Sequence, residues 1–246
     1  MKKTCCRRIL LKISGEILKG DAPFGVDPEA CLRFGCVLKK LLELNFQVGI
    51  VVGGGNFLRG ARLAELGMER PQADEMGMLA TLMNGLALKQ ACRQQGLDVH
   101  LMSALECPKV AESVQRDKAQ RALARGEVVI FVGGTGSPFF TSDTAAALRA
   151  AEIQADVLLK ATKVKGIYSQ DPKKYPDAYR YREISYETLL ADKLMIMDAT
   201  AVALCRDQRI PIFVFEMQQL FAENLQESLW NSDCGSWVRN VTSQGE

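Results

Sequence analysis

The sequence predicts an α/β protein in which a mainly parallel sheet carries helices on both faces. Short apolar runs, each typical of a buried strand, alternate with longer segments of helical spacing through the first 155 residues. Several of these runs end in a lysine or a glycine-rich loop. Parallel strands present their carboxyl ends at one edge of the sheet, where such folds bind ligands. We therefore expect a binding site at that edge.

Composition limits the possible functions. Lys and Arg number 31 and Asp and Glu 29, so the net charge of +2 gives no bulk attraction to nucleic acid or to a membrane surface. The eight cysteines form no C-x-x-C pair and the one histidine, His100, has no histidine partner, so neither a zinc site nor a disulfide framework is indicated. We expect reduced thiols in a cytoplasm, and no apolar run approaches the ~20 residues of a membrane span.

The first predicted strand, residues 8–13, contains Lys12 near its carboxyl end. A lysine inside an apolar strand is costly to desolvate unless it meets an anion, so Lys12 is either a snorkelling edge residue or a phosphate ligand. Its position at the strand end favours the ligand. A helix follows, because Asp27 is a good N-cap, Pro28 suits the first helical position, and apolar residues recur at helical spacing up to Leu44.

A second predicted strand, residues 46–52, runs into three consecutive glycines at 53–55. A plain turn needs one or two glycines, so three indicate a close approach of the backbone to a ligand. Beyond them, Arg59 could bind phosphate in a bidentate fork, whereas Arg62 could be only a solvated charge.

A long helix is predicted over residues 72–95. Its apolar stripe is more typical of a core or a subunit interface than of a cofactor site, and comprises Met76, Leu79, Met83, Leu86 and Ala87. Asp74, in the predicted first turn, suits either the helix dipole or a ligand hydroxyl, and the dipole is the simpler interpretation.

The next elements lead towards a loop. Residues 99–102 are a predicted strand in which His100 is expected to face solvent or a neighbour and not to be catalytic. A charged helix is predicted over residues 108–125, and a fourth strand covers residues 127–132.

The loop at residues 133–143 reads Gly-Gly-Thr-Gly-Ser-Pro-Phe-Phe-Thr-Ser-Asp, between a buried strand and a helix that Asp143 is expected to cap. Glycines let the backbone approach an anion, hydroxyls donate hydrogen bonds, and the helix start presents unpaired N–H groups, so phosphate fits. Phe139 and Phe140 either pack on a flat group such as a base or drop back into the core, and the sequence favours neither alternative.

The second half repeats this logic. A strand at residues 156–160 ends in Lys160, and the loop at residues 166–172 carries Tyr168 and Asp171, which suit adenine and ribose but are also ordinary loop residues. The remaining predicted elements are a short helix from Ser185, a helix from an Asp198 cap to residue 208, a strand at 211–215, a helix at 220–230 and a strand at 235–239.

Together these segments resemble the bacterial uridylate (UMP) kinase family of the amino acid kinase superfamily, over nearly the whole chain. The matching motifs are Lys12-Ile-Ser-Gly15-Glu16, Gly53-Gly54-Gly55-Asn56 with residues 57–60, Gly77-Met-Leu-Ala-Thr81 with Met83-Asn-Gly-Leu-Ala87, Gly134-Thr-Gly136 with Pro138-Phe-Phe-Thr141, Leu159-Lys-Ala-Thr-Lys163, and Asp171-Pro172. Each motif is weak alone, whereas their order and spacing are specific.

The resemblance implies one domain over residues 1–246 with a three-layer αβα fold of the amino acid kinase type and no Walker P-loop. It implies ATP with Mg²⁺ as donor, UMP as acceptor, UDP as product, a cytoplasmic hexamer, and UTP as feedback inhibitor. The acceptor part would span roughly residues 1–155 and the ATP part roughly residues 156–246.

The resemblance also implies roles for individual residues. ATP would contact Lys12, Ile13, Ser14, Gly15, Gly55, Arg59, Thr162, Tyr168 and Asp171. UMP would contact Gly54, Asp74, Thr135, Gly136, Ser137, Pro138, Phe139, Phe140, Thr141 and Ser142. The residues expected to catalyse transfer are Lys12, Lys160, Arg59, Asp143 and Asp198.

Cations are the expected catalysts, because the acceptor phosphate is already anionic and needs no strong base. Lys12 and Lys160 would neutralise charge on the transferring group, and Mg²⁺ would bridge ATP oxygens largely through water. Asp143, Asp156 and Asp198 would orient lysines or metal-bound water.

Four positions depart from the family pattern: Ser137 for Asn, Ser142 for Thr, Lys165 for Asp, and Pro23 for Gly in a loop that takes part in GTP regulation in relatives. Three rival classes remain. A kinase of acetylglutamate, glutamate or aspartate would not explain Phe139 and Phe140 together with Asp74. A non-catalytic nucleotide sensor would not need both lysines, and a Rossmann dehydrogenase would need a G-x-G-x-x-G after the first strand.

Overall fold

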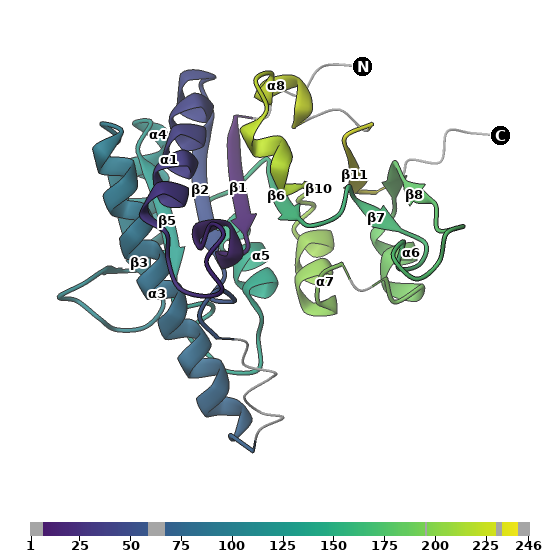
Figure 1. Cartoon of the computed structure of the whole chain (residues 1–246), viewed down its shortest axis with the longest axis horizontal. Coiled ribbons are helices and arrows are strands. Elements are labelled where there is room, and N and C mark those ends of the chain that lie inside the picture. Colours follow the sequence, from purple (N-terminus) through teal and green to yellow (C-terminus); the bar gives the residue numbers. More distant parts are fainter. Residues whose placement is uncertain (1–6, 59–66, 195, 230–232, 241–246) are drawn as a thin grey trace.

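The computed structural model describes residues 7–58, 67–194, 196–229 and 233–240, and its centre is a nine-stranded sheet (Figure 1). Among these residues the strand order is β4-β3-β5-β2-β1-β6-β10-β11-β9, and every pairing is parallel except that of β10 with β11. The strands are β1 Arg8–Ile13, β2 Gln47–Val52, β3 Val99–Ser103, β4 Glu112–Ser113, β5 Val128–Val132, β6 Val157–Thr162, β9 Glu183–Ile184, β10 Ile212–Glu216 and β11 Gly235–Val238. A separate antiparallel hairpin joins β7 Ile167–Tyr168 and β8 Arg180–Tyr181.

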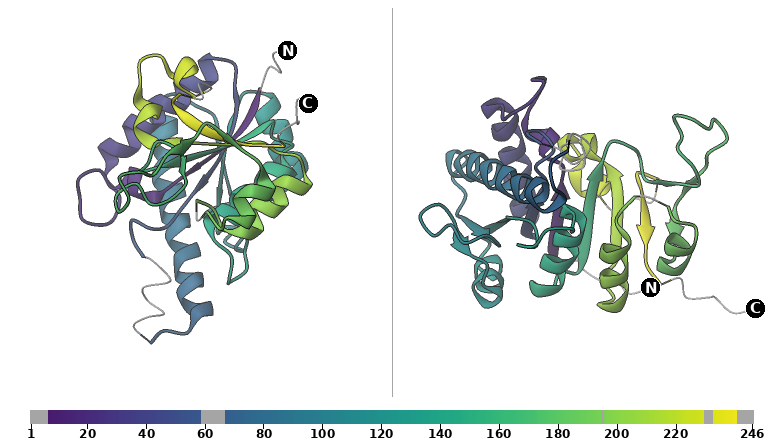
Figure 2. Two further views of the ribbon diagram at one scale, coloured as in Figure 1. Left: turned by 90° about the vertical axis from the view of Figure 1, so that its right-hand side faces the viewer. Right: turned by 90° about the horizontal axis from the view of Figure 1, so that it is seen from below.

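Helices cover both faces of the sheet (Figure 2). They are the 3₁₀ helices η1 Gly15–Leu18 and η2 Met217–Phe221, and the α-helices α1 Pro28–Glu43, α3 Arg70–Gln94, α4 Arg116–Ala124, α5 Ser142–Glu152, α6 Tyr186–Ala191, α7 Ala199–Asp207 and α8 Leu225–Ser228. One buried apolar cluster, the first cluster, joins the sheet to α1, α3 and α8. The second cluster joins the other face to α4, α5, α6 and α7. The predicted αβα fold with a mainly parallel sheet is confirmed.

The pleat of the strands directs both strand-end lysines to one side. Leu11 belongs to the first cluster and Leu10 to the second, so Lys12 projects to the side of Leu10. In β6 the same alternation places Lys160 on the side of Leu158. That is the face covered by α5.

The predicted helix over residues 108–125 is wrong in its first half. Only α4 is helical, and residues 112–113 form β4, which pairs with β3. Ala111 packs against the first cluster and Val114 against the second, on opposite faces of the sheet. A helix would have turned these two side chains to the same side, because residues three apart share a helix face.

The predicted helix over residues 220–230 is also wrong as a single element. It is divided into η2 and α8, and the backbone at Ala222 is extended. Leu220 and Leu225 both pack into the first cluster. Five residues of continuous helix would rotate them about 140° apart, so the break brings both onto the sheet.

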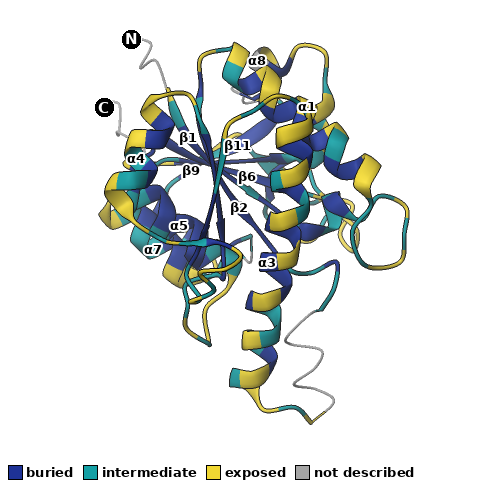
Figure 3. Cartoon of the chain, turned by 90° about the vertical axis from the view of Figure 1, so that its left-hand side faces the viewer, coloured by how far each residue is buried: buried dark blue, intermediate teal, exposed yellow. Residues whose placement is uncertain are grey.

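Three of the five residues in the predicted apolar stripe of α3 lie outside the core, whereas Ala87 packs against the first cluster. Leu79, Met83 and Leu86 are 53%, 46% and 41% exposed, while Leu88 on the opposite side of the helix packs into the first cluster. Figure 3 shows exposed residues along the outer side of α3, whose N-terminal turns extend beyond the body of the molecule. The core alternative is therefore wrong for these three side chains, and the interface alternative stays a prediction.

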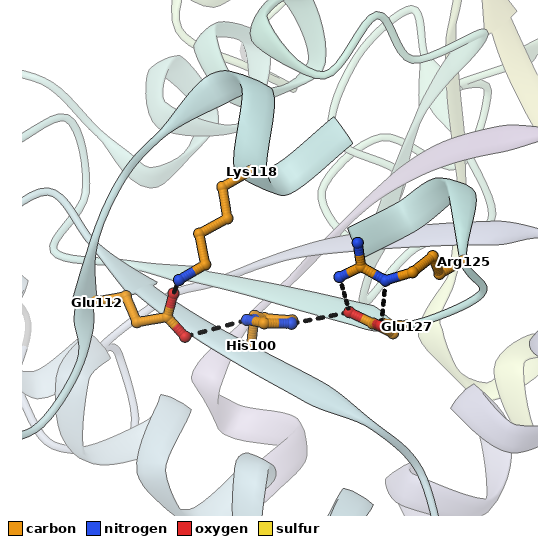
Figure 4. A network of polar contacts seen from close by, with 5 residues as sticks. All are labelled: His100, Glu112, Lys118, Arg125 and Glu127. Atoms are coloured by element: carbon orange, nitrogen blue, oxygen red, sulfur yellow. Dashed lines mark hydrogen bonds and ion pairs between the residues drawn. The ribbon is translucent and has the colours of Figure 1, made fainter. Parts of the chain in front are cut away.

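His100 lies in a chain of charges at the β4 edge of the sheet (Figure 4). Its Nδ1 lies 3.0 Å from a Glu112 oxygen and its Nε2 lies 2.8 Å from a Glu127 oxygen. Lys118 pairs with Glu112 at 2.6 Å, and Arg125 pairs with Glu127 at 2.5 Å. Each ring nitrogen of His100 thus faces a carboxylate oxygen. This network ties β3, β4, β5 and α4 together and lies apart from the carboxyl edge of β1 and β6.

Within the described ranges we find no helix that combines the length and the hydropathy needed to cross a bilayer.

Candidate active site

The candidate site is built around two lysines that share one carboxylate. Lys12 and Lys160 are register partners in the adjacent strands β1 and β6. The Lys12 ammonium lies 2.8 Å from Asp143 Oδ1, and the Lys160 ammonium donates to Asp143 Oδ2 at 2.5 Å. All three side chains are largely buried, with 8–14% of their surface exposed. We name this group the Lys–Asp–Lys cluster.

The two lysines keep the buried Asp143 carboxylate ionised. Burial by itself opposes ionisation of Asp143, but the nearby ammonium groups of Lys12 and Lys160 outweigh it and keep the pKa of Asp143 below its ordinary value. Burial lowers the pKa of Lys160 to about 8, with Asp143 opposing that shift and Lys12 adding to it. One carboxylate between two ammonium groups leaves the cluster with a net positive charge, which suits an anionic ligand.

Asp143 does not cap α5 as predicted. Thr141 is the N-cap, and its hydroxyl accepts a hydrogen bond from Asp143 N at 3.0 Å. The Asp143 carboxylate is thus free to meet the lysines. Asp198, the predicted cap of α7, accepts from Ala201 N at 2.8 Å and also from the hydroxyls of Thr141 and Thr144 at 2.6 and 2.9 Å. Asp198 is therefore fixed beside the start of α5.

Asp156 lies at the wrong end of the sheet for its predicted role. Its carboxylate accepts from the backbone N–H groups of Arg7 and Arg8, each at 2.8 Å, where β1 begins. Lys12 lies at the other end of that strand, so Asp156 cannot orient lysines or metal-bound water at the cluster.

The glycines after β1 and β2 serve packing as well as any ligand. A Cβ on Gly15 would lie 2.2 Å from Asn56 Oδ1, and one on Gly54 would lie 2.7 Å from Gly77 O. A Cβ on Gly55 would meet nothing within 4 Å. Of the three, Gly55 is the one with open space beside it.

The loop after β5 is held in an unusual shape by α3. Gly133, Gly134 and Gly136 have positive φ angles, and so does Phe139, with φ 72°. Thr81 accepts from Gly133 N at 2.7 Å, and Asp74 accepts from Phe139 N at 2.8 Å.

The aromatic pair of this loop stays at the surface. Phe139 is 65% exposed and Phe140 is 46% exposed. The core alternative is therefore wrong, and two aromatic faces remain available for a flat group.

A small cavity of about 130 Å³ lies between this loop, α3 and the residues after β2. Its lining includes six of the residues predicted to contact UMP: Gly54, Asp74, Thr135, Phe140, Thr141 and Ser142. The other four, Gly136, Ser137, Pro138 and Phe139, lie on the same loop outside the lining. The turn that carries Thr141 and Ser142 continues into Asp143, so the cavity adjoins the Lys–Asp–Lys cluster.

Asp74 does not act on the helix dipole, because α3 begins at Arg70 and its first turn contains no acidic residue. Its carboxylate contacts Arg70 Nε at 2.7 Å as well as Phe139 N. The ligand alternative stays a prediction, now with the side chain at the cavity wall.

The residues predicted for the ATP side lie at the ends of β1, β2 and β6 and on the β7–β8 hairpin. Thr162 donates to Val164 O at 2.7 Å, and Asp171 accepts from Lys173 N at 3.0 Å in a local turn. Tyr168 is half-buried within β7. Lys163 forms an ion pair with Glu16, which joins the end of β6 to the turn after β1. Arg59, predicted to serve both substrates, lies outside the described residues.

Sequence reasoning gave no role to three polar residues that build the site. Thr81 holds the loop after β5, Thr144 holds Asp198, and Asn84 binds the residues after β2. Thr81 and Asn84 are buried on the inner side of α3. Polar residues at core positions of a helix were the signal that could have revealed them, because buried polar groups need partners.

A cationic cluster and a glycine-walled cavity at the carboxyl edge of an αβα sheet define a phosphate-handling enzyme. The family model described as the amino acid kinase family matches residues 7–216, and the chain belongs to that family.

The chain is similar to proteins named uridylate kinase or UMP kinase. It is 56% identical over 232 residues to the uridylate kinase of Protochlamydia amoebophila, covering 94% of this chain and 92% of that protein. The crystal structure of UMP kinase from Bacillus anthracis has a TM-score of 0.89 and 30% identity, covering 96% and 97% of the two chains. That of UMP kinase from Ureaplasma parvum has a TM-score of 0.85 and 36% identity, covering 95% and 97%. The resemblance found in the motifs is confirmed.

Proposed function

We propose that this protein transfers the γ-phosphoryl group of ATP to UMP, giving ADP and UDP. The observation that carries the proposal is that Thr141 and Ser142 of the cavity wall run directly into Asp143 of the Lys–Asp–Lys cluster, which supports a cationic centre next to the cavity beside Asp74. The names of its relatives support the same reaction.

In this reaction a UMP phosphate oxygen forms a bond to the γ-phosphorus while the bond to the β–γ bridging oxygen breaks and ADP leaves. Both reactants are anions, so the barrier is charge repulsion and positioning. In the proposed reaction Lys12 and Lys160 would supply two ammonium groups where the anions meet, and Asp143 pairs with both groups in the free protein. No general base is required.

Mg²⁺ fits this site through the nucleotide. Among the described residues, no three His, Cys, Asp or Glu side chains are grouped as a metal cage. Mg²⁺ in nucleotide sites is held by phosphate oxygens and waters with one or two carboxylates, and we assign such waters to Asp143 and Asp198, which both bond to Thr141 at the start of α5. When bound, the ion would neutralise charge on the ATP phosphates.

We assign UMP to the cavity and the loop beside it, and ATP to the edge formed by β1, β6 and the β7–β8 hairpin. The acceptor part would then span roughly residues 1–155 and the donor part roughly residues 156–246. The exposed rings of Phe139 and Phe140 support this assignment, because a pyrimidine would cover apolar faces that water now contacts.

The test is a coupled assay of ADP release with candidate acceptors. UMP should be the preferred acceptor, CMP a poorer one, and acetylglutamate, glutamate and aspartate inactive. Turnover with an amino acid and none with UMP would reject the proposal in favour of a carboxylate kinase. Nucleotide binding without any turnover would instead indicate a sensor.

Replacing Asp74 by asparagine is expected to raise KM for UMP about tenfold, because a carboxylate accepts hydrogen bonds from sugar hydroxyls more strongly than an amide does. The ratio of kcat/KM for UMP to that for 2′-deoxy-UMP should also fall. Glu75→Gln is the control, since Glu75 is exposed on the same helix. Unchanged discrimination between the two nucleotides would remove Asp74 from ribose binding.

The ATP complex should show a pH dependence that originates at Lys160. Its pKa in the free protein is about 8, and an anion beside it raises that pKa. Binding should therefore take up a proton between about pH 8 and 10, and ATP affinity should fall as pH rises through that range. Calorimetry at pH 9 in two buffers of different ionisation enthalpy measures the uptake. No uptake in the protein, or equal uptake in Lys160→Met, would contradict the assignment.

We propose that the exposed stripe of α3 joins copies of this chain into a hexamer. Leu79, Met83 and Leu86 expose apolar surface in a row, as at subunit contacts. Met83→Glu should lower the mass measured in solution, whereas Phe221→Glu, at another exposed apolar residue, should leave it unchanged. An unaltered mass in Met83→Glu would exclude this stripe.

Three further assignments complete the proposal. UTP would act as feedback inhibitor, which a titration of UTP into the UMP assay tests. The cytoplasm is proposed as the compartment because the six cysteines of the described residues are free thiols. The net charge of +2 gives no reason to propose nucleic acid as a partner.

A further inference from the structure

We propose that Asn56 and Asn84 form a positioning pair that fixes the two glycine turns of the phosphate-binding edge for phosphoryl transfer. The inference rests on the proposed kinase reaction and adds to it two residues that contact neither nucleotide in our assignment. Neither residue is catalytic, because the pair acts through the backbone of residues 15 and 53.

The two amides are interlocked. Asn56 Nδ2 donates to Asn84 Oδ1 at 2.8 Å, and Asn84 Nδ2 donates back to Asn56 Oδ1 at 2.7 Å. The second proton of each amide goes to a backbone carbonyl: Asn84 Nδ2 donates to Gly53 O at 2.8 Å, and Asn56 Nδ2 donates to Gly25 O at 2.7 Å. All four amide protons of the pair are therefore used.

Burial makes this arrangement rigid. Asn84 is 0% exposed and Asn56 is 3% exposed, so water cannot replace a lost partner at the surface. Turning either amide over would bring its oxygen against a carbonyl oxygen, of Gly53 or of Gly25, and would leave the N–H groups without acceptors. One orientation is thus strongly preferred.

The pair lies directly under both glycine turns. A Cβ at Gly15 would lie 2.2 Å from Asn56 Oδ1 and 2.7 Å from Asn84 Nδ2, so the backbone of residue 15 rests on the two amides. Gly53, whose carbonyl Asn84 holds, also donates its N–H to Ile13 O at 3.0 Å. Ile13 is the neighbour of Lys12. The pair therefore fixes the position of both turns relative to β1, the strand that carries the proposed catalytic Lys12.

The helix α3 carries Asn84 and anchors the positioning pair to the core. Asn84 belongs to the buried side of a long helix, one turn before Leu88 of the first cluster. The same helix holds the loop after β5 through Thr81 and Gly133 N. One helix therefore positions the backbone on both the donor and the acceptor sides of the site. A misplacement of about 1 Å at a reacting centre can cost 10²-fold in rate.

Asn84→Leu tests the inference, because leucine has similar volume and makes none of the hydrogen bonds. In the UMP assay we expect kcat to fall about 30- to 100-fold, while KM for UMP changes less than about threefold. Leu123→Ala is the matched control, because it opens a cavity in α4 in the second cluster and should lower stability with kcat within about twofold of the unmodified protein. Asn84→Ser, which leaves room for a bridging water, should recover part of the lost kcat and keeps the test valid if the leucine variant does not fold.

A folded Asn84→Leu variant with a kcat loss no larger than that of Leu123→Ala would overturn the inference. So would a loss confined to KM. A second readout separates this failure from failure of the proposed function: amide hydrogen exchange at residues 53–55 should be at least about tenfold faster in Asn84→Leu, with α4 unchanged. If the unmodified protein does not phosphorylate UMP, the proposed function fails, and unchanged exchange at residues 53–55 would then reject the positioning pair as well.

Discussion

Replacing Lys160 by methionine is expected to reduce kcat about 10²- to 10³-fold, the effect of removing one buried donor that meets developing charge. Methionine keeps the length and apolar stem of the side chain, so packing in β6 should persist. The ammonium that remains on Lys12 would still pair with Asp143, leaving a cluster without excess positive charge. KM for UMP should change little, because UMP is assigned to the cavity beside Asp74.

The measurement is steady-state ADP release at saturating ATP and UMP. Lys118→Met is the matched control, because Lys118 pairs with Glu112 at the β4 edge and contacts nothing in the Lys–Asp–Lys cluster. Lys160→Arg should restore the charge but little of the rate, because a planar guanidinium does not reproduce a compact ammonium beside the same carboxylate. Turnover within about threefold of the unmodified protein in Lys160→Met would remove this lysine from the chemistry.

The strand and cap predictions that held share a local cause. Lys12 and Lys160 interrupt apolar runs whose other members must be buried, and the pleat then decides the face on which each lysine lies. Asp27 and Ser185 cap their helices through bonds that span two or three residues, which the sequence displays directly. The strands, the sheet and these two caps were therefore within reach of sequence reasoning.

The predictions that failed depended on partners far along the chain. Aspartate is common at the N-cap of helices, yet Thr141 is the N-cap of α5 and Asp143 forms ion pairs with lysines from two strands. Glu112 lies in a charged segment that suits a helix, but pairing with β3 gives it strand geometry. For Leu79 only the core alternative failed, because the spacing of an apolar stripe cannot tell which side of a helix faces the sheet.

Replacing Asp143 by alanine is expected to destabilise the folded protein by about 3–5 kcal/mol, because it leaves two ammonium groups buried without their shared partner. The melting temperature should fall by about 10 °C, given the usual scale for chains of this size. Inorganic phosphate should restore part of this loss, since an anion can take the place of the carboxylate. Calorimetric melting with and without phosphate measures both effects.

The loss of stability in Asp143→Ala should also depend on pH, in a direction set by Lys160. Asp143 opposes the burial that lowers the pKa of Lys160, so without Asp143 that pKa should lie below its value of about 8. Between this lowered pKa of Lys160 and pH 8, unfolded Asp143→Ala binds more protons than folded Asp143→Ala, so the stability of the variant should rise with pH. Over the same range the titration of Lys160 adds nothing to the stability of the unmodified protein. The difference in melting temperature should therefore narrow as pH rises towards 8. Asp156→Ala, at the opposite end of the sheet, is the control, and phosphate should not raise its melting temperature more than that of the unmodified protein. The same lack of response in Asp143→Ala would mean that the two lysines do not depend on the Asp143 carboxylate.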